Sequence, residues 1–352
     1  MQLLDKTIAL TRSWALRLTP GGRRRIALEQ GALHSKDRRP GLTDVTDSGF
    51  AASSDGIMVR WETTGPAADE PARATVLFLH GFTLAGDSFY LQAEHLRDSH
   101  PDVRCVCPDM RGHGRTGPTD PDLCTVDGLA DDALAALTDA DHTDAPLILV
   151  GHSLGGLAVF NFLRRAPEEI RRRVAGVVVV ATSIEALSDQ GVPQLLASPA
   201  ADAVYEAAEA SPKEAEWLRE EVTKMIAPGL AVGVFRRPTN YELIEFHAAM
   251  IHETPLETFV GFFDSLQSHD ELKAGPALAG VPGFVITGTG DVVTPGEQAD
   301  RIQEVWPEAK RIDAFGSGHM IILEAPAVVN KALDVLIDAL PEEQAQPEKQ
   351  GE

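Results

Sequence analysis

A chain of 352 residues is long enough to bury a substantial hydrophobic core, either as one large domain with an insertion or as two domains. Hydrophobic residues make up 43% of it and charged residues 24%, as in ordinary soluble globular proteins, and no apolar run is long enough to span a bilayer. The formal net charge of −22 argues against broad nucleic-acid binding, because a phosphate backbone would be repelled.

The three cysteines cannot form a fully paired set of disulfides. Cys105 and Cys107 fall in a predicted strand, where alternate residues share a face and the two side chains would pack side by side. We interpret all three as reduced residues in or near the core rather than as a metal site. Unpaired cysteines favour a reducing compartment, and the expected location is the cytoplasm.

The first 47 residues are interpreted as a basic arm and a linker. Residues 1–40 hold nine Lys or Arg against three Asp or Glu, and the apolar residues of 3–18 are spaced as in a short amphipathic helix. The segment lacks the apolar core and cleavage site of a secretory signal. Three interpretations stay open: a helix docked on its own domain or on a second subunit, a membrane-surface anchor, and a disordered or targeting extension.

Beyond residue 48, apolar segments alternate with helical ones. The sequence predicts strands at 57–62, 75–79, 103–107, 147–150, 174–181, 283–287 and 311–314. It predicts helices between or after them at 88–96, 129–137, 158–166, 296–305 and 326–340. Strands that are apolar throughout and alternate with helices indicate an α/β fold, a mostly parallel, doubly wound sheet covered on both faces.

The alternation breaks between residues 183 and 272, where only helical patterns occur. Helices are expected at 203–210, 212–226, 241–252 and 256–266. The last one has an apolar stripe, with Phe262 off it, formed by Leu256, Phe259, Val260, Phe263 and Leu266. We interpret this stretch as an all-helical cap over the carboxyl edge of the sheet.

These boundaries divide the chain into five parts. The predicted parts are the arm and linker (1–47), the first half of the core (48–182), the cap (183–272), the second half of the core (273–340) and a disordered acidic tail (341–352).

Residues 147–157, LILVGHSLGGL, run from a predicted strand through a sharp turn into a helix, with Ser153 at the apex. Gly151 and Gly155 stand two residues before and after the serine, where so tight a turn leaves no room for a Cβ. The turn holds the serine in strained backbone geometry and presents its Oγ above the sheet. Ser153 is therefore the candidate nucleophile.

A serine hydroxyl is a weak nucleophile until a histidine takes its proton and a carboxylate fixes that histidine in the right tautomer. Asp291 follows the predicted strand 283–287 in the loop TGTGD, and His319 follows the next strand in the loop FGSGH. The order Ser, Asp, His places all three at strand ends of such a sheet. Glu185 is a rival acid, and His152, which should point away from the serine, is interpreted as structural.

Oxyanion-hole donors of the backbone leave no side-chain pattern, so they are assigned by position. The turn HGF at 80–82 ends the strand 75–79, and we expect the N–H groups of Phe82 and Leu154 to be these donors. Asp109 and Arg111 are interpreted as fixing their own loop. Candidates for the lining of the substrate pocket are His80, Phe259, Phe262 and Phe263.

Together these motifs resemble those of the α/β-hydrolase superfamily. The segments that carry the resemblance are HGF at 80–82, DMRGHGRT at 109–116, GHSLGG at 151–156, GTGD at 288–291 and GH at 318–319. The likeness covers residues 50–340 apart from the cap. It implies that Ser153 is the nucleophile, Asp291 the acid and His319 the base, and that the cap shapes the pocket, but it does not identify the substrate.

A serine nucleophile favours an acyl-enzyme, whereas an aspartate at this position would resemble haloalkane dehalogenases or epoxide hydrolases. The expected activity is hydrolysis of a carboxylic ester, thioester or lactone of a small, largely apolar substrate, with no metal or organic cofactor. Alternatives on the same triad are a C–C bond hydrolase, a cofactor-free haloperoxidase and a lyase. A non-catalytic ligand-binding homologue is the alternative of another class.

Two adjacent arginines stand in the predicted cap. Arg236 and Arg237 have two interpretations: they receive an anionic group of the substrate, or they form a solvated turn.

Overall fold

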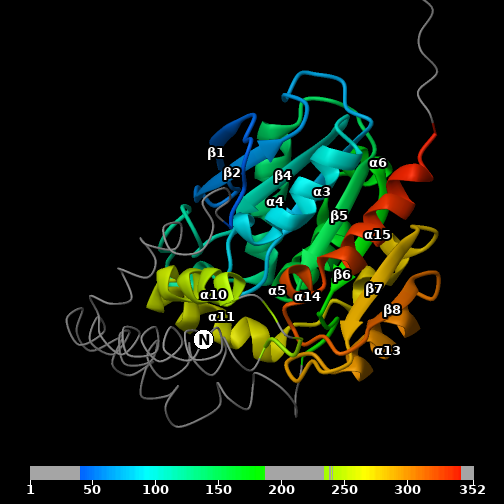
Figure 1. The fold of residues 1–352 in the computed structure, drawn as a ribbon. Coiled ribbons are helices and arrows are strands. Elements are labelled where there is room, and N and C mark those ends of the chain that lie inside the picture. The colour runs from blue at the N-terminus through cyan, green and yellow to red at the C-terminus, as the bar shows by residue number, and fades with distance from the viewer. Residues whose placement is uncertain (1–39, 187–233, 238, 240, 342–352) are drawn as a thin grey trace, which may run out of the picture.

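The computed structural model of the protein describes residues 40–186, 234–237, 239 and 241–341. Residues 1–39 of the arm, the helices expected at 203–210 and 212–226, and the tail beyond residue 341 lie outside the described residues. One twisted sheet crosses the molecule and helices lie on both of its faces, with α3 and α15 in front of it in Figure 1.

Eight strands form the sheet in the order β1-β2-β4-β3-β5-β6-β7-β8. Their bounds are β1 Ser48–Ala52, β2 Met58–Thr64, β3 Ala74–Leu79, β4 Val103–Asp109, β5 Leu147–His152, β6 Val174–Val180, β7 Gly283–Gly288 and β8 Lys310–Ala314. β1 and β2 are antiparallel to their neighbours, and every pairing from β4 to β8 is parallel. The predicted mostly parallel α/β sheet is confirmed.

The central strands are buried on both faces because their side chains alternate between two hydrophobic cores. β3 sends Leu77 and Leu79 to one core and Val76 and Phe78 to the other. The helices that cover the faces are α3 Tyr90–Ser99, α4 Val126–Ala140, α5 Leu154–Arg165, α13 Gly296–Val305 and α15 Pro326–Asp338. None of the described helices is long and apolar enough to cross a membrane.

Several short elements have no clear sequence pattern. These are β1, the 3-10 turns η1 Gly86–Phe89, η2 Pro121–Leu123 and η3 Leu272–Ala274, and the short helices α6 Glu168–Arg173, α12 Gly275–Leu278 and α14 Ile321–Glu324. β1, SGFAA, is an edge strand that pairs on one side only, and its one large apolar residue, Phe50, is exposed. Such a strand needs no alternation of apolar and polar residues.

Two helices of the inserted segment are described, α10 Tyr241–Glu253 and α11 Leu256–Ser268. In α11, the Thr258 hydroxyl donates to the carbonyl of Gly112 and the Ser265 hydroxyl to that of Cys124, in the loops that follow β4. Phe262, between them on the same face, is fully buried. Phe262, which the sequence pattern leaves off the apolar stripe, therefore faces the core, whereas the stripe residues Phe259, Val260 and Leu266 are half-buried.

The inserted segment leaves the sheet and returns to it at one place, which we call the neck. Residues 184–186 run antiparallel to residues 269–271, and the N–H of Ala186 donates to the carbonyl of His269 at 2.8 Å. The Ser183 hydroxyl lies 3.1 Å from Nε2 of His269, and both side chains are buried. The interpretation of residues 183–272 as an all-helical cap stays a prediction.

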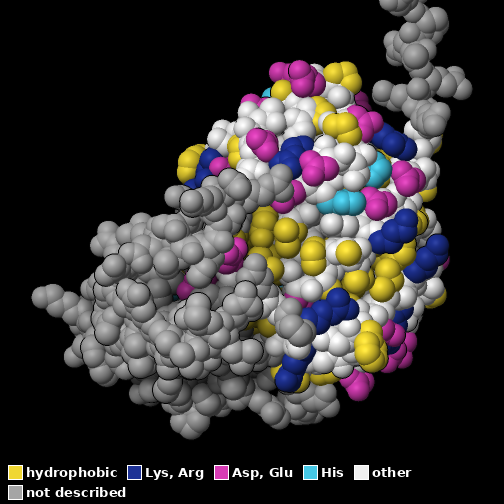
Figure 2. Space-filling view, in the orientation of Figure 1, with side chains coloured by type: hydrophobic (Ala, Val, Ile, Leu, Met, Phe, Trp, Pro, Cys, Tyr) yellow, Lys and Arg dark blue, Asp and Glu magenta, His cyan; other side chains and the backbone are white. Residues whose placement is uncertain are grey.

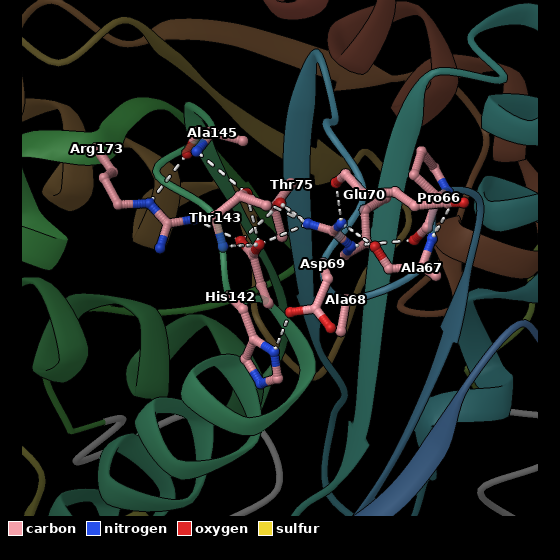
Figure 3. Close-up of polar contacts among 12 residues, drawn as sticks. Pro66, Ala67, Ala68, Asp69, Glu70, Thr75, His142, Thr143, Ala145 and Arg173 are labelled. Carbon is pink, nitrogen blue, oxygen red and sulfur yellow. Dashed lines mark hydrogen bonds and ion pairs between the residues drawn. The ribbon is translucent and has the colours of Figure 1, made fainter.

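A buried ion cluster closes the opposite, amino end of the sheet (Figure 3). Arg104 of β4 pairs with Asp141, which follows α4, and both side chains are fully buried. Asp141 also accepts from the hydroxyl of Thr75 at 2.8 Å and pairs with Arg173. Burial alone would raise the pKa of Asp141, but the hydrogen bonds of Thr143, Thr75 and Arg173 outweigh it and lower that pKa.

The surface carries both signs of charge. On the described part of the face shown in Figure 2, basic side chains lie among acidic ones, and hydrophobic side chains gather near the middle. The expectation of no nucleic-acid partner stays a prediction.

Candidate active site

The turn after β5 holds Ser153 in a strained conformation. Ser153 has φ +52° and ψ −118°, a left-handed geometry that is rare for a residue with a side chain. A Cβ on Gly151 would lie 2.4 Å from the carbonyl oxygen of Gly155, and a Cβ on Gly155 would lie 2.0 Å from that of Leu79. The prediction that this turn excludes a Cβ at both positions is confirmed.

His319 lies beside the serine. Its Nε2 is 3.0 Å from Ser153 Oγ, and its Nδ1 is 2.9 Å from Oδ2 of Asp291. A carboxylate can only accept, so Nδ1 carries the proton and donates to Asp291. Nε2 then accepts the hydrogen bond of the Ser153 hydroxyl. This tautomer of His319 is the one that a general base requires.

Asp291 is buried and its oxygens are all used. Oδ1 accepts the N–H groups of Val293 and Thr294 at 2.8 and 3.0 Å, and the Thr294 hydroxyl donates to Oδ2 at 2.8 Å. Burial alone would raise the pKa of Asp291, but the nearby His319 and these hydrogen bonds outweigh it and hold that pKa below its ordinary value. Asp291 is therefore ionised at neutral pH.

The sheet brings the three residues together. Ser153 follows β5, Asp291 follows β7 and His319 follows β8, and β5 to β8 are consecutive parallel strands whose carboxyl ends share one edge. The rival acid Glu185 lies in the neck, where it pairs with Arg301. The structure thus places Asp291, and not Glu185, against the histidine.

His152 is hydrogen-bonded to the backbone of the loop that carries His319. Its Nε2–H donates to the carbonyl of His319 at 3.0 Å, and burial lowers its pKa to about 3, so the ring stays neutral. This bond is compatible with the interpretation of His152 as structural, which stays a prediction. Asp109 and Arg111 also hold loops, as predicted: Asp109 accepts the N–H groups of Gly86 and Arg115, and Arg111 pairs with Asp132.

The turn 80–82 packs against the nucleophile. A Cβ on Gly81 would lie 3.2 Å from the Cβ of Ser153, so the backbone of Phe82 lies close to the serine. Leu154 begins α5, and the first N–H groups of a helix have no acceptor within it. The assignment of these two N–H groups as oxyanion donors is compatible with this placement and stays a prediction.

The pocket candidates divide into interior and accessible residues. His80 is fully buried: it donates from Nδ1 to the carbonyl of Gly81 and accepts the N–H of Met110 at Nε2, so neither nitrogen is free for a substrate. Phe262 is fully buried as well, whereas Phe259 is half-buried against the ring of Phe82 at 5.1 Å between centroids. The side chain of Phe263 lies outside the described residues.

Two residues of the site escape the sequence analysis. Thr294 follows Asp291 by three residues, a spacing typical of aspartates that bond to the chain after them, and this signal could have indicated it. His247 of α10 is buried, and burial and then the neighbouring His319 lower its pKa to about 3. Nothing in the sequence marks His247, because only the fold brings α10 near His319.

Part of the chain is similar in sequence to two mycobacterial lipases. The chain is 37% identical to lipase LipV of Mycobacterium tuberculosis over 100 residues, which are 28% of this chain and 34% of that lipase. It is 28% identical to monoacylglycerol lipase of Mycolicibacterium smegmatis over 116 residues, 32% of this chain and 40% of that lipase. The matched region therefore spans well under half the length of either curated relative.

Solved structures match over a greater length. An esterase from Thermogutta terrifontis is 25% identical, with a TM-score of 0.65 and coverage of 84% of this chain and 99% of that one. An esterase from Exiguobacterium antarcticum shares the fold with a TM-score of 0.65 at 16% identity, covering 83% of this chain and 100% of its own. The sequence profile of the alpha/beta hydrolase family matches residues 76–332, from β3 to α15. A match over most of the chain, together with the strand order and the serine turn, means that this chain belongs to the alpha/beta hydrolase family.

Proposed function

We propose that this protein is a serine hydrolase that cleaves a carboxylic ester, thioester or lactone of a small, largely apolar substrate through an acyl-enzyme on Ser153. The observation that carries the proposal is the continuous hydrogen-bonded chain from Ser153 through His319 to Asp291, with distances of 3.0 and 2.9 Å. The lipases and esterases among the similar proteins support ester hydrolysis at the level of the family.

In the proposed first half-reaction, Ser153 Oγ attacks the acyl carbon while Nε2 of His319 takes its proton. The new oxyanion is stabilised by the N–H groups of Phe82 and Leu154. His319 then gives the proton to the leaving oxygen or sulfur as its bond to the acyl carbon breaks. The products of this step are an acyl-enzyme and a free alcohol or thiol.

In the second half-reaction, a water molecule replaces the leaving group. His319 takes a proton from the water molecule while the water oxygen attacks the acyl carbon. The bond between that carbon and Ser153 Oγ then breaks. His319 returns a proton to the serine, and a carboxylic acid leaves. Asp291 stays ionised throughout and stabilises the histidine each time it carries the extra proton.

An apolar acyl group is favoured by two aromatic side chains, one of which belongs to the turn that packs against Ser153. The rings of Phe82 and Phe259 meet edge to face, and both residues are only half-buried, so one side of each is available to a substrate. No described cluster of three or more His, Cys, Asp or Glu side chains is arranged to hold a metal ion. The proposed chemistry takes its nucleophile and its base from the chain itself.

The cytoplasm is the proposed location. Cys105, Cys107 and Cys124 are all unpaired and buried, and burial raises the pKa of Cys105 to about 12. Reduced core cysteines of this kind fit a reducing compartment. Contact of the arm with a membrane surface or with a second subunit remains an open prediction, because residues 1–39 lie outside the described residues.

A fluorophosphonate probe with a panel of esters and thioesters of varied acyl length tests the proposed function. The wild type should be labelled at Ser153 and should turn over one class of the panel. Ser153→Ala should lose labelling and at least about 10³-fold of kcat while it keeps the wild-type melting temperature. Turnover that survives in Ser153→Ala would refute the acyl-enzyme, and an unlabelled wild type would favour a non-catalytic homologue.

A further inference from the structure

A short piece of the inserted segment lies against the loop that carries the catalytic histidine. The carbonyl of Val234 accepts the N–H of His319 at 2.8 Å and that of Met320 at 3.3 Å. A Cβ on Gly318 would lie 2.3 Å from this same carbonyl oxygen. The glycine before His319 therefore has a packing role, because it lets residues 234–237 approach the backbone of the loop.

One carboxylate joins the two segments. Glu324, the last residue of α14, accepts the N–H groups of Arg236 and Arg237 at Oε2, both at 2.9 Å. Its Oε1 accepts the N–H of Gly318, the residue before His319. Hydrogen bonds to an ionised acceptor are about twice as strong as neutral ones. Glu324 thus ties three backbone N–H groups from both sides of the contact.

The two arginine side chains extend the contact to both catalytic loops. Nε of Arg236 donates to the carbonyl of Gly290, the residue before Asp291, at 3.2 Å. Arg237 donates to the carbonyl of Phe315, at the start of the loop that holds the histidine, at 2.7 Å. These bonds give the arginines a role other than a free anion site or a solvated turn. We call residues 234–237 with Glu324 the clasp.

Apart from the clasp, the histidine loop is bonded to the loop before Asp291: the N–H of Gly316 donates to the Thr289 hydroxyl, and the Ser317 carbonyl accepts the N–H of Gly290, both at 2.8 Å. The side chain of Phe315 is 84% exposed, and Gly316 has a left-handed φ of +74°. The hydrogen bond from His152 holds only the carbonyl of His319 on the inner side. The clasp supplies the bonds to the N–H groups of residues 318–320 and to the carbonyl of Phe315.

We propose that Glu324 is a positioning residue for the catalytic histidine, and that the base is correctly placed only when residues 234–237 are docked on its loop. This inference rests on the proposed function, since it assigns the placement of His319 in that reaction to the inserted segment. Glu324 touches no reacting atom and acts through the backbone of Gly318 and the clasp.

Glu324→Gln is the direct test. The amide keeps the size of the side chain but turns an NH2 group toward at least one of the N–H donors, so one side of the clasp opens. Glu308→Gln is the matched control, because Glu308 is an exposed residue before β8, at the far end of that strand from His319. Three measurements are made on both variants and the wild type: the rate of Ser153 phosphonylation by a fluorophosphonate, kcat and KM for the best ester, and amide hydrogen exchange of residues 315–324.

For Glu324→Gln we expect phosphonylation and kcat to fall by about tenfold to a hundredfold, with KM within about twofold of the wild type. Exchange of residues 315–324 should accelerate, and Glu308→Gln should change none of these. Arg237→Ala, which removes only the bond to Phe315, should show a smaller loss of the same kind and serves if Glu324→Gln does not fold.

The outcomes separate the two proposals. A wild type that never reacts with the probe contradicts the proposed function, while the exchange measurement still tests the clasp. A reactive wild type with a Glu324→Gln variant of equal rate and equal exchange overturns the positioning role. A loss of rate that only follows the unfolded fraction of the variant, with unchanged exchange in the folded part, overturns it as well.

Discussion

At the scale of single residues, the site depends on the hydrogen bonds that the two carboxylate oxygens of Asp291 accept. Oδ2 is shared between Nδ1 of His319 and the hydroxyl of Thr294, and that hydroxyl is also 3.4 Å from Nδ1. The threonine thus fixes the direction in which the carboxylate faces the imidazole. A carboxylate held in this way keeps the histidine in the tautomer that accepts the serine proton.

Thr294→Val keeps the shape of the side chain and removes its hydroxyl. We expect kcat to fall by roughly tenfold with little change in KM, since a hydrogen bond to a charged group contributes about 1.5 kcal/mol. Steady-state kinetics on the best ester measures the effect. Thr138→Val is the control, because Thr138 is exposed and bonds only to the carbonyl of Leu134 within α4; an equal loss in both variants would contradict the role of Thr294.

Residue types at the strand ends predicted which three side chains come together at the site; their role as a catalytic triad stays a prediction. Ser153, Asp291 and His319 were all placed from the sequence, and the glycines around the serine have the steric role expected of them. The clasp residue Glu324 could not be predicted. Its partners are the backbone N–H groups of Gly318 and of Arg236 and Arg237, which lie 88 and 87 residues away along the chain, and backbone donors leave no trace in the sequence.

At the scale of elements, the fully buried aromatic residue of α11, Phe262, lies off the apolar stripe that the sequence pattern indicates. The face that turns inward carries Thr258, Phe262 and Ser265, because two hydroxyl bonds to core carbonyls and one aromatic ring fit the loops after β4. Phe259, one residue beyond Thr258, remains half-buried beside Phe82. Periodicity indicates that a helix has two faces, but the partner surface decides which of them is buried.

Two alanine substitutions in α11 should therefore separate stability from specificity. Phe262→Ala empties a fully buried site and should lower the free energy of unfolding by about 3–5 kcal/mol. Phe259→Ala should cost far less stability and instead raise KM for esters with apolar acyl groups. Chemical denaturation and kinetics on the ester panel measure the pair. The opposite assignment of the two effects would refute the orientation of α11.

At the scale of the whole molecule, the candidate active site and the buried ion cluster lie at opposite ends of the sheet. The carboxyl end holds the strained Ser153 and the loops that carry Asp291 and His319, and the amino end is closed by the buried cluster around Arg104 and Asp141. Breaking such a pair leaves one buried charge without its partner, which is strongly destabilising. The sequence predicted every strand of the sheet except β1, but it did not predict this cluster, because the members of the cluster come from separate elements and only the sheet order joins them.

Buried neutral histidines should make the protein sensitive to mild acid. Burial lowers the pKa of His80 to about 4 and that of His113 to about 3, while the unfolded chain titrates near 6.5. The stability that such a residue contributes is complete above pH 6.5 and is lost as pH falls toward the folded pKa, by up to about 1.4 kcal/mol per pH unit. Asp141 and Asp291, whose pKa values are lowered, lose their contribution only below about pH 4.

We therefore expect the free energy of unfolding to fall from about pH 6.5 to pH 5, the range in which the histidines of the unfolded chain bind protons. Denaturant titrations at closely spaced pH values measure the slope. His113→Asn should make it shallower, whereas His142→Gln should not, because His142 is an exposed residue whose pKa is raised by Asp69. A flat profile above pH 5 would contradict the burial of these rings as neutral groups.

The pairing in the neck makes the position of the two ends of the inserted segment independent of the segment's length. Residues 184–186 and 269–271 are paired with each other. The two ends of the inserted segment therefore stay at the same place beside the sheet, whatever the length of the chain between them. The entropy cost of a longer loop grows slowly, by about 0.6 kcal/mol for each doubling. We therefore expect that residues can be added or removed between the two paired stretches while the register of the flanking strands β6 and β7 stays intact.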